Sequence, residues 1–414
     1  MNAPKLRFPE FWEAGEWKTR ELREFITERS QIPVDKLPLF SLTIEDGVTP
    51  KTERYERSFL VKNEKDAYKL VCQNDFAYNP MNLRFGAIGR HSGCQNVALS
   101  KYYNIFYCDE TVDSIFCEIY FKSDGMLTHY DDVATGSLIE KRRVHFSNFL
   151  KIKIVFPSLS EQQKIAACLS SLDELITAQA QKVEALKTHK KGLMQQLFPA
   201  TGETVPKLRF PEFLEAGEWV LEEFSRYIVL YRGSSPRPIQ NYLTSDSSGV
   251  NWIKIGDTKY SENFVINQVE ERITPEGAKK SRKVNVGELI LANSMSYGKT
   301  YQVAITGCIY DGWFVLRDYE KHFDKQFLLQ LLNSEYMQNQ YERFSAGGIV
   351  QNISSEIVYK TVLPNTSLEE QQKIAACLSS LDELITAQAQ KLEALKTHKK
   401  GLMQQLFPAA NGTE

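Results

Sequence analysis

The chain has 414 residues, of which 42% are hydrophobic and 25% charged; these values are typical of globular proteins and exclude a largely disordered or fibrous chain. At roughly 100–200 residues per domain, the length predicts about two to four domains. The formal net charge of −2 excludes an overall basic excess, so any nucleic-acid binding must come from local basic clusters.

No apolar run approaches the roughly 20 residues that span a bilayer, and residues 1–11, MNAPKLRFPEF, lack the long apolar stretch of a signal peptide. We therefore expect a cytoplasmic protein with no membrane segment. The seven cysteines are odd in number and form no CxxC pair. In a reducing compartment this predicts mostly buried thiols rather than a disulfide or zinc framework.

Two segments of the chain occur twice. Residues 4–17, PKLRFPEFWEAGEW, recur at 206–219 with one substitution, and residues 158–200 recur at 367–409 with two. The blocks that separate these repeats share almost no identity. The predicted domains are an N-terminal repeat segment (1–17), the first block (18–157), the first arm (158–200), a linker with the second short repeat (201–219), the second block (220–366) and the second arm with a tail (367–414).

The first block is predicted to be rich in strands. Residues 76–92 and 102–121 contain β-branched and aromatic runs punctuated by Gly and Asn, and residues 149–159 form a strand that leads into the first arm. Tyr78 is followed by an Asn79-Pro80 turn. We expect this turn to leave the end of a strand.

The first arm is predicted to be one helix from Glu161 to Phe198, because Ser158 or Ser160 can cap it and no proline occurs before Pro199. Its apolar residues follow a 4-3 spacing, which is the narrow seam of a two-stranded coiled coil. The second arm repeats the seam in the same phase. The predicted seam residues include Ile165, Leu169, Leu172, Ile176, Leu186, Ile374, Leu378, Leu381, Ile385 and Leu395.

The two arms most simply pair with each other in antiparallel fashion, with an approximate two-fold relation between the halves of the chain. A polar residue in the seam can set its register, and Gln179 and Gln388 occupy equivalent seam positions. Pairing of the arms with another chain is the alternative.

The second block repeats the mixture of strands and helices. Strands are predicted within 250–258, 283–294 and 301–317, followed by one helix at 323–344. Ala292 precedes Asn293 as Tyr78 precedes Asn79 in the first block. The predicted fold class is therefore α+β, with two globular domains joined by two long helices.

Motifs for catalysis are absent or incomplete. Residues 296–300, SYGKT, end like a phosphate-binding loop, but Asn293 stands where its first glycine belongs. The Asn79-Pro80 turn faintly resembles the base-gripping loop of amino-methyltransferases, without the second proline or the aromatic residue. The six histidines are scattered without metal-ligand spacing. We expect no catalytic residues, no metal and no bound cofactor.

The organisation of the whole chain resembles the specificity subunit of Type I restriction-modification systems. The most specific element is a strand ending at Pro157 or Pro364, followed by the Glu-Gln-Gln-Lys-Ile opening of each arm at 161–165 and 370–374. This resemblance implies a non-catalytic reader of double-stranded DNA. Each block would be a target recognition domain for one half of a bipartite, asymmetric site, and the arms would form a spacer.

The resemblance also implies partners. The arms would dock two adenine methyltransferase subunits, and a restriction and translocase subunit would join the complex. S-adenosylmethionine, ATP and Mg²⁺ would then be bound by those partners.

DNA contacts are predicted at two kinds of position. Arg, Lys and Asn side chains in or near the strand-end loops suit base edges in the major groove, whereas the clusters KRRVH and KKSRK suit phosphates, with a solvated turn as the alternative. The candidate DNA-binding residues are Asn79, Arg84, Arg90, Lys141, Arg142, Arg143, Arg237, Lys279, Lys280, Arg282, Lys283, Asn293, Tyr297 and Lys299.

Two other functions remain open from the sequence. One is a coiled-coil adaptor that binds proteins instead of DNA. The other is a self-contained DNA methyltransferase, against which the missing nucleotide motifs argue.

Overall fold

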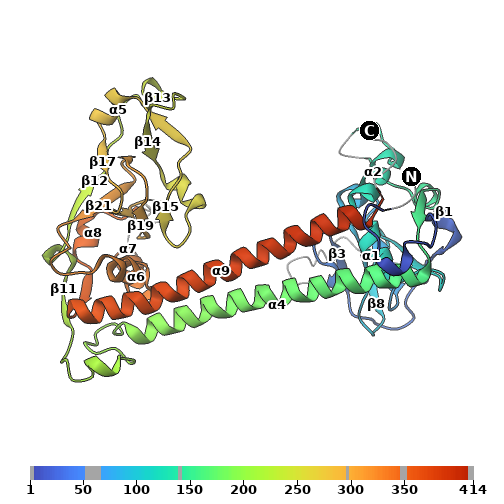
Figure 1. The fold of residues 1–414 in the computed structure, drawn as a ribbon, viewed down its shortest axis with the longest axis horizontal. Coiled ribbons are helices and arrows are strands. Elements are labelled where there is room, and N and C mark those ends of the chain that lie inside the picture. The colour runs from blue at the N-terminus through green and yellow to red at the C-terminus, as the bar shows by residue number, and fades with distance from the viewer. Residues whose placement is uncertain (1–3, 52–66, 139–141, 295–297, 346–351, 409–414) are drawn as a thin grey trace. The chain divides into compact units, whose positions relative to one another are not determined.

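The computed structural model forms two compact units, and Figure 1 shows one block and parts of both arms in each. Unit 1 comprises Met1–Gln179 and Lys391–Glu414, and unit 2 comprises Ala180–Gln390. None of the helices described is both long enough and apolar enough to cross a membrane. The structure describes residues 4–51, 67–138, 142–294, 298–345 and 352–408.

In unit 1, the described residues of the first block form a four-stranded sheet in the order β2-β9-β6-β7, the ladders β1-β10, β3-β4 and β5-β8, and helices α1 to α3. The elements are β1 (Lys18–Glu21), β2 (Ile26–Glu28), β3 (Phe40–Thr43), β4 (Gly47–Pro50), β5 (Tyr68–Val71), β6 (Phe76–Tyr78), β7 (Ile88–Arg90), β8 (Val97–Ser100), β9 (Asn104–Cys108), α1 (Ser114–Phe121), α2 (Asp124–Val133), α3 (Phe146–Phe149) and β10 (Lys153–Phe156).

The four-stranded sheet is the middle of three layers. Phe76 and Tyr78 of β6 and Phe106 of β9 belong to the core that the sheet shares with the helices. Ala77 and Ile105, at the alternate positions, belong to a second core with the β3-β4 and β5-β8 ladders. Because successive side chains of a strand point to opposite faces, one run of apolar residues supplies both cores.

In unit 2, the described part of the second block forms two five-stranded sheets, β12-β21-β18-β19-β15 and β13-β16-β14-β20-β17, a β11-β22 ladder and four helices. The elements are β11 (Val220–Glu223), β12 (Val229–Arg232), β13 (Leu243–Thr244), β14 (Val250–Ile253), β15 (Val265–Ile266), β16 (Glu271–Ile273), α5 (Pro275–Lys279), β17 (Arg282–Val284), β18 (Leu289–Ala292), β19 (Thr300–Val303), β20 (Gly307–Ile309), β21 (Trp313–Arg317), α6 (Lys325–Asn333), α7 (Glu335–Ser345), α8 (Ser355–Tyr359) and β22 (Val362–Asn365).

The layers of unit 2 follow the same plan. Leu289 and Leu291 of β18 pack toward α6, α7 and α8, while Ile290 and Ala292 pack toward the second sheet. The order β12-β21-β18-β19 therefore corresponds to β2-β9-β6-β7 of unit 1. The two blocks share a strand order although their sequences differ, and the predicted α+β fold class is confirmed.

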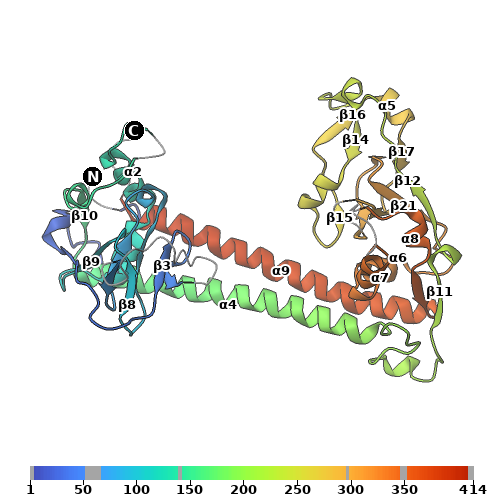
Figure 2. The ribbon, with the colours of Figure 1, turned by 180° about the vertical axis from the view of Figure 1, so that it is seen from behind.

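The arms form helices α4 (Leu159–Leu197) and α9 (Leu368–Leu406), which run antiparallel (Figures 1 and 2). In unit 1, Lys399 Nζ lies 2.5 and 2.6 Å from the carboxylate oxygens of Asp173. In unit 2, Lys190 Nζ lies 2.7 Å from both carboxylate oxygens of Asp382. Residue numbers thus rise along one helix as they fall along the other, and the predicted pairing of the arms within one chain is confirmed.

The start of each arm belongs to a block core as well as to the seam. Ile165 and Leu169 are buried in the core of unit 1, and Ile374 and Leu378 in that of unit 2. The end of the opposite arm joins the same core. Further along the seam the other predicted residues are only partly buried, because two paired helices alone cannot enclose a side chain completely. These residues are Leu172, Ile176, Leu186, Leu381, Ile385 and Leu395.

Two predicted elements are wrong. Strand was predicted across 102–121, but only β9 is extended there and Ser114–Phe121 is helix α1. Asp113 caps this helix by accepting a hydrogen bond from Phe116 N at 2.8 Å, and the aromatic side chains of the helix are buried in the core. The single helix predicted at 323–344 is broken at Ser334, whose φ of −69° and ψ of 158° are extended.

Candidate nucleic-acid interface

The asparagine loops of the two blocks occupy equivalent places. Asn79 follows β6 and Asn293 follows β18, and each of these strands is third in its corresponding sheet order. The topology therefore brings the predicted reading loops to the same edge of each block's sheet.

Asn79 in unit 1 shapes its own loop. Its side-chain oxygen accepts a hydrogen bond from Met81 N at 3.0 Å, and its backbone N–H donates to Ala87 O at 3.0 Å. This is an Asx turn that returns the chain toward β7. The asparagine is half-buried, and its contact with DNA stays a prediction.

An arginine and an aromatic ring lie at the tip of the same loop. The guanidinium carbon of Arg84 lies 4.6 Å from the centre of the Phe85 ring, and its Nη1 lies 3.3 Å from Asp131 Oδ1. Arg142 binds the same carboxylate at 3.2 Å. Phe85 is 55% exposed, an unusual position for a large apolar side chain at the tip of a loop. The sequence carries no signal for this exposure, because a lone phenylalanine usually belongs to a core.

The other candidates in unit 1 differ in how they are engaged. Arg90 is held by Glu118 at 2.9 Å and by Asn74 at 2.6 Å. Arg143 is exposed, and its backbone pairs with that of Thr135. Lys141 lies outside the described residues.

Asn293 in unit 2 is buried rather than presented to a ligand. Its side-chain N–H donates to Asp311 O at 3.0 Å, and its backbone oxygen accepts from Ile353 N at 2.8 Å. In the described structure it therefore fixes a loop, and base contact by Asn293 stays a prediction. Lys299 is half-buried; burial lowers its pKa, an effect that Glu342 opposes. Tyr297 lies outside the described residues.

A strip of aromatic rings and cationic side chains runs over the second block. Arg282 and Arg317 have guanidinium carbons 5.4 and 5.5 Å from the centre of the Tyr231 ring. Lys280 Nζ lies 4.7 Å from the centre of the Tyr242 ring. Arg317 also pairs with Glu288 at 2.7 Å, and Arg282 Nε donates to the backbone oxygen of Arg232 at 3.3 Å. Stacking of this kind orders the cationic side chains against the rings. The two tyrosines and Arg317 had no signal in the sequence, because their partners come from distant strands.

Three further cations lie at the surface of the second block. Lys279 and Lys283 are exposed. Arg237 is 80% exposed and lies 3.3 Å from Asp311, whose pKa is lowered mainly by a hydrogen bond from Ser235 and further by this arginine. A weak, exposed pair of this kind costs little to break, so Arg237 is the base-edge candidate that is most accessible among those described; its contact with DNA stays a prediction.

Among the described candidates for phosphate contact, Arg143, Lys279, Lys280 and Lys283 are exposed, whereas Arg142 and Arg282 are partly buried and bonded within the chain. Most candidates for base edges are also bonded within the chain.

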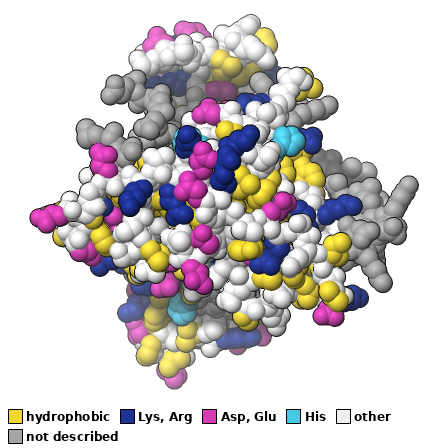
Figure 3. Space-filling view, turned by 90° about the vertical axis from the view of Figure 1, so that its right-hand side faces the viewer, with side chains coloured by type: hydrophobic (Ala, Val, Ile, Leu, Met, Phe, Trp, Pro, Cys, Tyr) yellow, Lys and Arg dark blue, Asp and Glu magenta, His cyan; other side chains and the backbone are white. Residues whose placement is uncertain are grey.

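Cationic and acidic side chains are interspersed on the face in Figure 3, with hydrophobic side chains between them. On this face, therefore, positive and negative side chains lie side by side and do not form separate patches of one sign. No group of three or more His, Cys, Asp or Glu in the described part of the chain could hold a metal ion.

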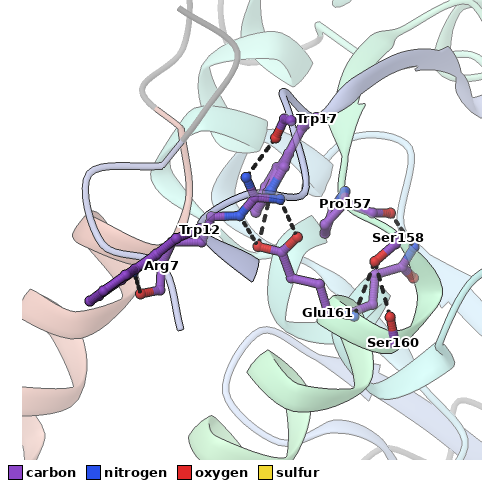
Figure 4. A network of polar contacts seen from close by, with 9 residues as sticks. Arg7, Trp12, Trp17, Pro157, Ser158, Ser160 and Glu161 are labelled. Atoms are coloured by element: carbon purple, nitrogen blue, oxygen red, sulfur yellow. Dashed lines mark hydrogen bonds and ion pairs between the residues drawn. The ribbon is translucent and has the colours of Figure 1, made fainter. Parts of the chain in front are cut away.

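A buried ion pair ties each short repeat to the start of an arm. Glu161 is 1% exposed and accepts hydrogen bonds from Arg7 Nε at 2.8 Å and Nη2 at 2.7 Å, and from Trp17 Nε1 at 3.3 Å (Figure 4). Glu370 pairs with Arg209 in the same two-pronged way, at 2.7 Å for both contacts. Two parallel hydrogen bonds fix the orientation of an arginine relative to a carboxylate as well as the distance between them. Each short repeat, and with it the block that follows, is therefore anchored at the same place on its arm.

The next residue of each arm holds the block itself. Gln162 Oε1 accepts from the backbone N–H of Asp113 at 2.9 Å, and Gln371 Oε1 accepts from that of Asp324 at 2.8 Å. Asp113 and Asp324 are the N-caps of α1 and α6. The Glu-Gln dipeptide that opens both arms thus positions the blocks, a role that the sequence alone did not reveal.

The chain matches the family model for the Type I restriction modification DNA specificity domain over residues 136–188 and 230–397. It is similar to the Type I restriction enzyme MjaVIII specificity subunit of Methanocaldococcus jannaschii, with 27% identity over 272 residues, covering 63% of this chain and 62% of the relative. The putative MjaX specificity subunit of the same organism is 26% identical over 290 residues, covering 68% and 66%. The chain thus spans less than two thirds of either relative.

Two solved structures share the fold. One is a chain from work on complex assembly and conformational transition of the type I R-M system, with a TM-score of 0.61, 16% identity, and coverage of 95% of this chain and 98% of that one. The other is the S subunit of a Type I restriction-modification system from M. genitalium, with a TM-score of 0.57, 14% identity, and coverage of 98% and 99%. At 16% and 14% identity, the similarity to these two structures shows a shared fold and nothing more.

Proposed function

Because the chain belongs to the family of the Type I restriction modification DNA specificity domain, we propose that it is the DNA-reading subunit of a Type I restriction-modification complex. The observation that carries this proposal is that the family match extends over parts of both blocks and both arms. The exposed lysines of the second block, Lys279, Lys280 and Lys283, support DNA as the ligand, since exposed cations suit phosphates.

Each block reads one half of a bipartite site. The support is structural: the blocks share a strand order and place their asparagine loops equivalently, yet the residues in these loops differ. Equivalent scaffolds with different loops suit two different half-sites. The site is therefore asymmetric, unlike the palindrome that a pair of identical readers recognises.

The arms are the spacer between the readers and the docking surface for two adenine methyltransferase subunits. They are the long segments that the two halves have in common, and two identical partners need two similar surfaces. A restriction and translocase subunit completes the complex. The partners bind S-adenosylmethionine, ATP and Mg²⁺, and this chain contributes sequence recognition without catalysing a reaction.

The test is an exchange of one reader. Residues 18–157 are replaced by the corresponding block of a relative, and methylated adenines are mapped by long-read sequencing of DNA from cells that carry the complete system. One half of the methylated motif should change while the other half stays the same. Changed bases in both halves would refute independent readers, and DNA methylation by the purified chain alone would refute the non-catalytic role.

A further inference from the structure

The two arms have nearly the same sequence but different surroundings. The repeated ion pair between them is Lys399 with Asp173 in unit 1 and Lys190 with Asp382 in unit 2. The side chain of Asp173 is 51% exposed, whereas that of Asp382 is only 17% exposed. Since the arm residues are the same, the difference must come from the blocks that pack beside them.

The second block covers its part of the arms with polar contacts. Gln330 of α6 donates to Asp382 Oδ2 at 2.8 Å. Glu335 of α7 binds Lys191 Nζ at 2.6 Å and accepts from Gln195 Nε2 at 2.5 Å. Figures 1 and 2 both show α6 and α7 beside the start of α9.

A third contact comes from the turn before β15. Asn263 Nδ2 donates to Thr386 Oγ1 at 2.8 Å, and both Asn263 and Phe264 adopt positive φ values, 48° and 60°. Positive φ is uncommon for residues other than glycine, so the surrounding packing must hold this turn in place against α9. A cavity of about 670 Å³, lined in part by Phe264 and Gln330, lies between the block and α4 beside the contacts of Glu335.

The first block does not reproduce these contacts. Counted from the equivalent caps Asp113 and Asp324, the position of Gln330 is occupied by Ile119, which packs in the core. The position of Glu335 is occupied by Asp124, which is exposed and shorter by one methylene group.

The arm residues of unit 1 are consequently open. Lys400 and Gln404 are the repeat equivalents of Lys191 and Gln195, and Thr177 is that of Thr386. The side chains of all three are exposed and form no hydrogen bond or ion pair with another residue that the structure describes. Lys191 and Gln195 in unit 2 are exposed too, but Glu335 engages both of them. We call the surface formed by Asp173, Thr177, Lys399, Lys400 and Gln404 the open face.

We propose that the two arms dock methyltransferase subunits with unequal affinity, the open face of unit 1 binding first and tightly. This inference rests on the docking role proposed above. The arms are identical at Thr177, Lys400 and Gln404 and their repeat equivalents, although packing in unit 1 imposes no constraint on these three exposed side chains. The face combines the half-exposed carboxylate of the Asp173–Lys399 pair with a second lysine, a threonine hydroxyl and one amide, which suits the mixed polar surface of a protein better than the phosphates of DNA. In unit 2 a partner must first displace the contacts of Gln330, Glu335 and Asn263.

The experiment titrates the full-length chain with the adenine methyltransferase subunit of the same system and resolves the bound species by native mass spectrometry. We expect two binding steps whose dissociation constants differ by about tenfold or more. Lys400→Glu should weaken the tight step about tenfold, because it reverses a charge on the open face. The matched variant Lys191→Glu, at the same place in unit 2 where the lysine pairs with Glu335, should leave the tight step unchanged.

A second pair of variants tests the cause of the inequality. Glu335→Ala, which releases Lys191 and Gln195 in unit 2, should bring the weak step toward the tight one, whereas Asp124→Ala in unit 1 should have no effect. Far-ultraviolet circular dichroism establishes that each variant is folded.

The outcomes separate this inference from the function on which it rests. Two equal steps in the unmodified chain, or equal effects of Lys400→Glu and Lys191→Glu, would overturn unequal docking and leave the proposed function intact. A chain that binds no methyltransferase subunit, or retains binding after both arms are removed, would overturn both.

Discussion

Replacing Arg7 by leucine should destabilise unit 1 by about 3 kcal/mol. The substitution leaves Glu161, which is 1% exposed, with the indole N–H of Trp17 at 3.3 Å and without its two charged hydrogen bonds. Breaking a buried ion pair by removing one partner typically costs about 3–5 kcal/mol. We expect the lower end because the Arg7 side chain is 13% exposed, so water can reach part of the vacated space.

The double variant Arg7→Leu with Glu161→Leu should be more stable than the single one. Removing both charges also removes the uncompensated carboxylate, and well-packed apolar replacements of buried pairs are often nearly neutral. The indole of Trp17 then loses its acceptor, at a cost of about 1 kcal/mol. We therefore expect the double variant to lie within about 2 kcal/mol of the unmodified protein.

The assay is urea-induced unfolding followed by tryptophan fluorescence, with Trp12 and Trp17 reporting on unit 1. Lys164→Ala is the matched control, because Lys164 pairs with Glu10 at 2.9 Å on the surface beside the same junction. An exposed pair of this kind contributes about 0–1 kcal/mol. A loss below about 1 kcal/mol for Arg7→Leu, or a double variant less stable than the single one, would refute the reasoning.

Three other outcomes are expected. Phe85→Ala should weaken recognition of the half-site read by the first block and leave the other half unchanged, as measured by DNA binding with each half-site mutated in turn. Lys283→Gln should reduce the magnitude of the slope of the log DNA-binding constant against log salt concentration by about one, without changing base preference. Fluorescence anisotropy at several salt concentrations measures this slope. One heptad inserted into both arms should lengthen each helix by about 10 Å and keep the seam in phase; the methylated motif should then gain one or two unread base pairs between unchanged half-sites.

The arms could be predicted because their signal is periodic and local. A 4-3 apolar spacing that occurs twice in one chain specifies both the helices and their pairing, whichever block lies between them. Helix α1 could not be predicted from the sequence, because its β-branched and aromatic residues suit a strand equally well. Its cap, Asp113, is a local signal, but the hydrogen bond that ties this cap to the arm joins Asp113 to Gln162, 49 positions away.

The candidate interface was predicted less completely than the fold. Clusters such as KKSRK are visible in the sequence, and Lys279 and Lys283 are indeed exposed. Composition cannot distinguish an asparagine that reads a base from one that braces a loop, and Asn293 is buried against the backbone of Asp311. The cluster of Tyr231 with Arg282 and Arg317 exists only after β12, β17 and β21 have come together.

The glutamines that follow the buried ion pairs have a consequence for how such proteins diversify. Gln162 and Gln371 hold their blocks through main-chain N–H groups, which every residue except proline provides. A block that acquires many substitutions, or is replaced as a whole by genetic exchange, still offers the arm the same hydrogen-bond donor. New recognition properties can therefore arise in evolution without a compensating mutation in the arm.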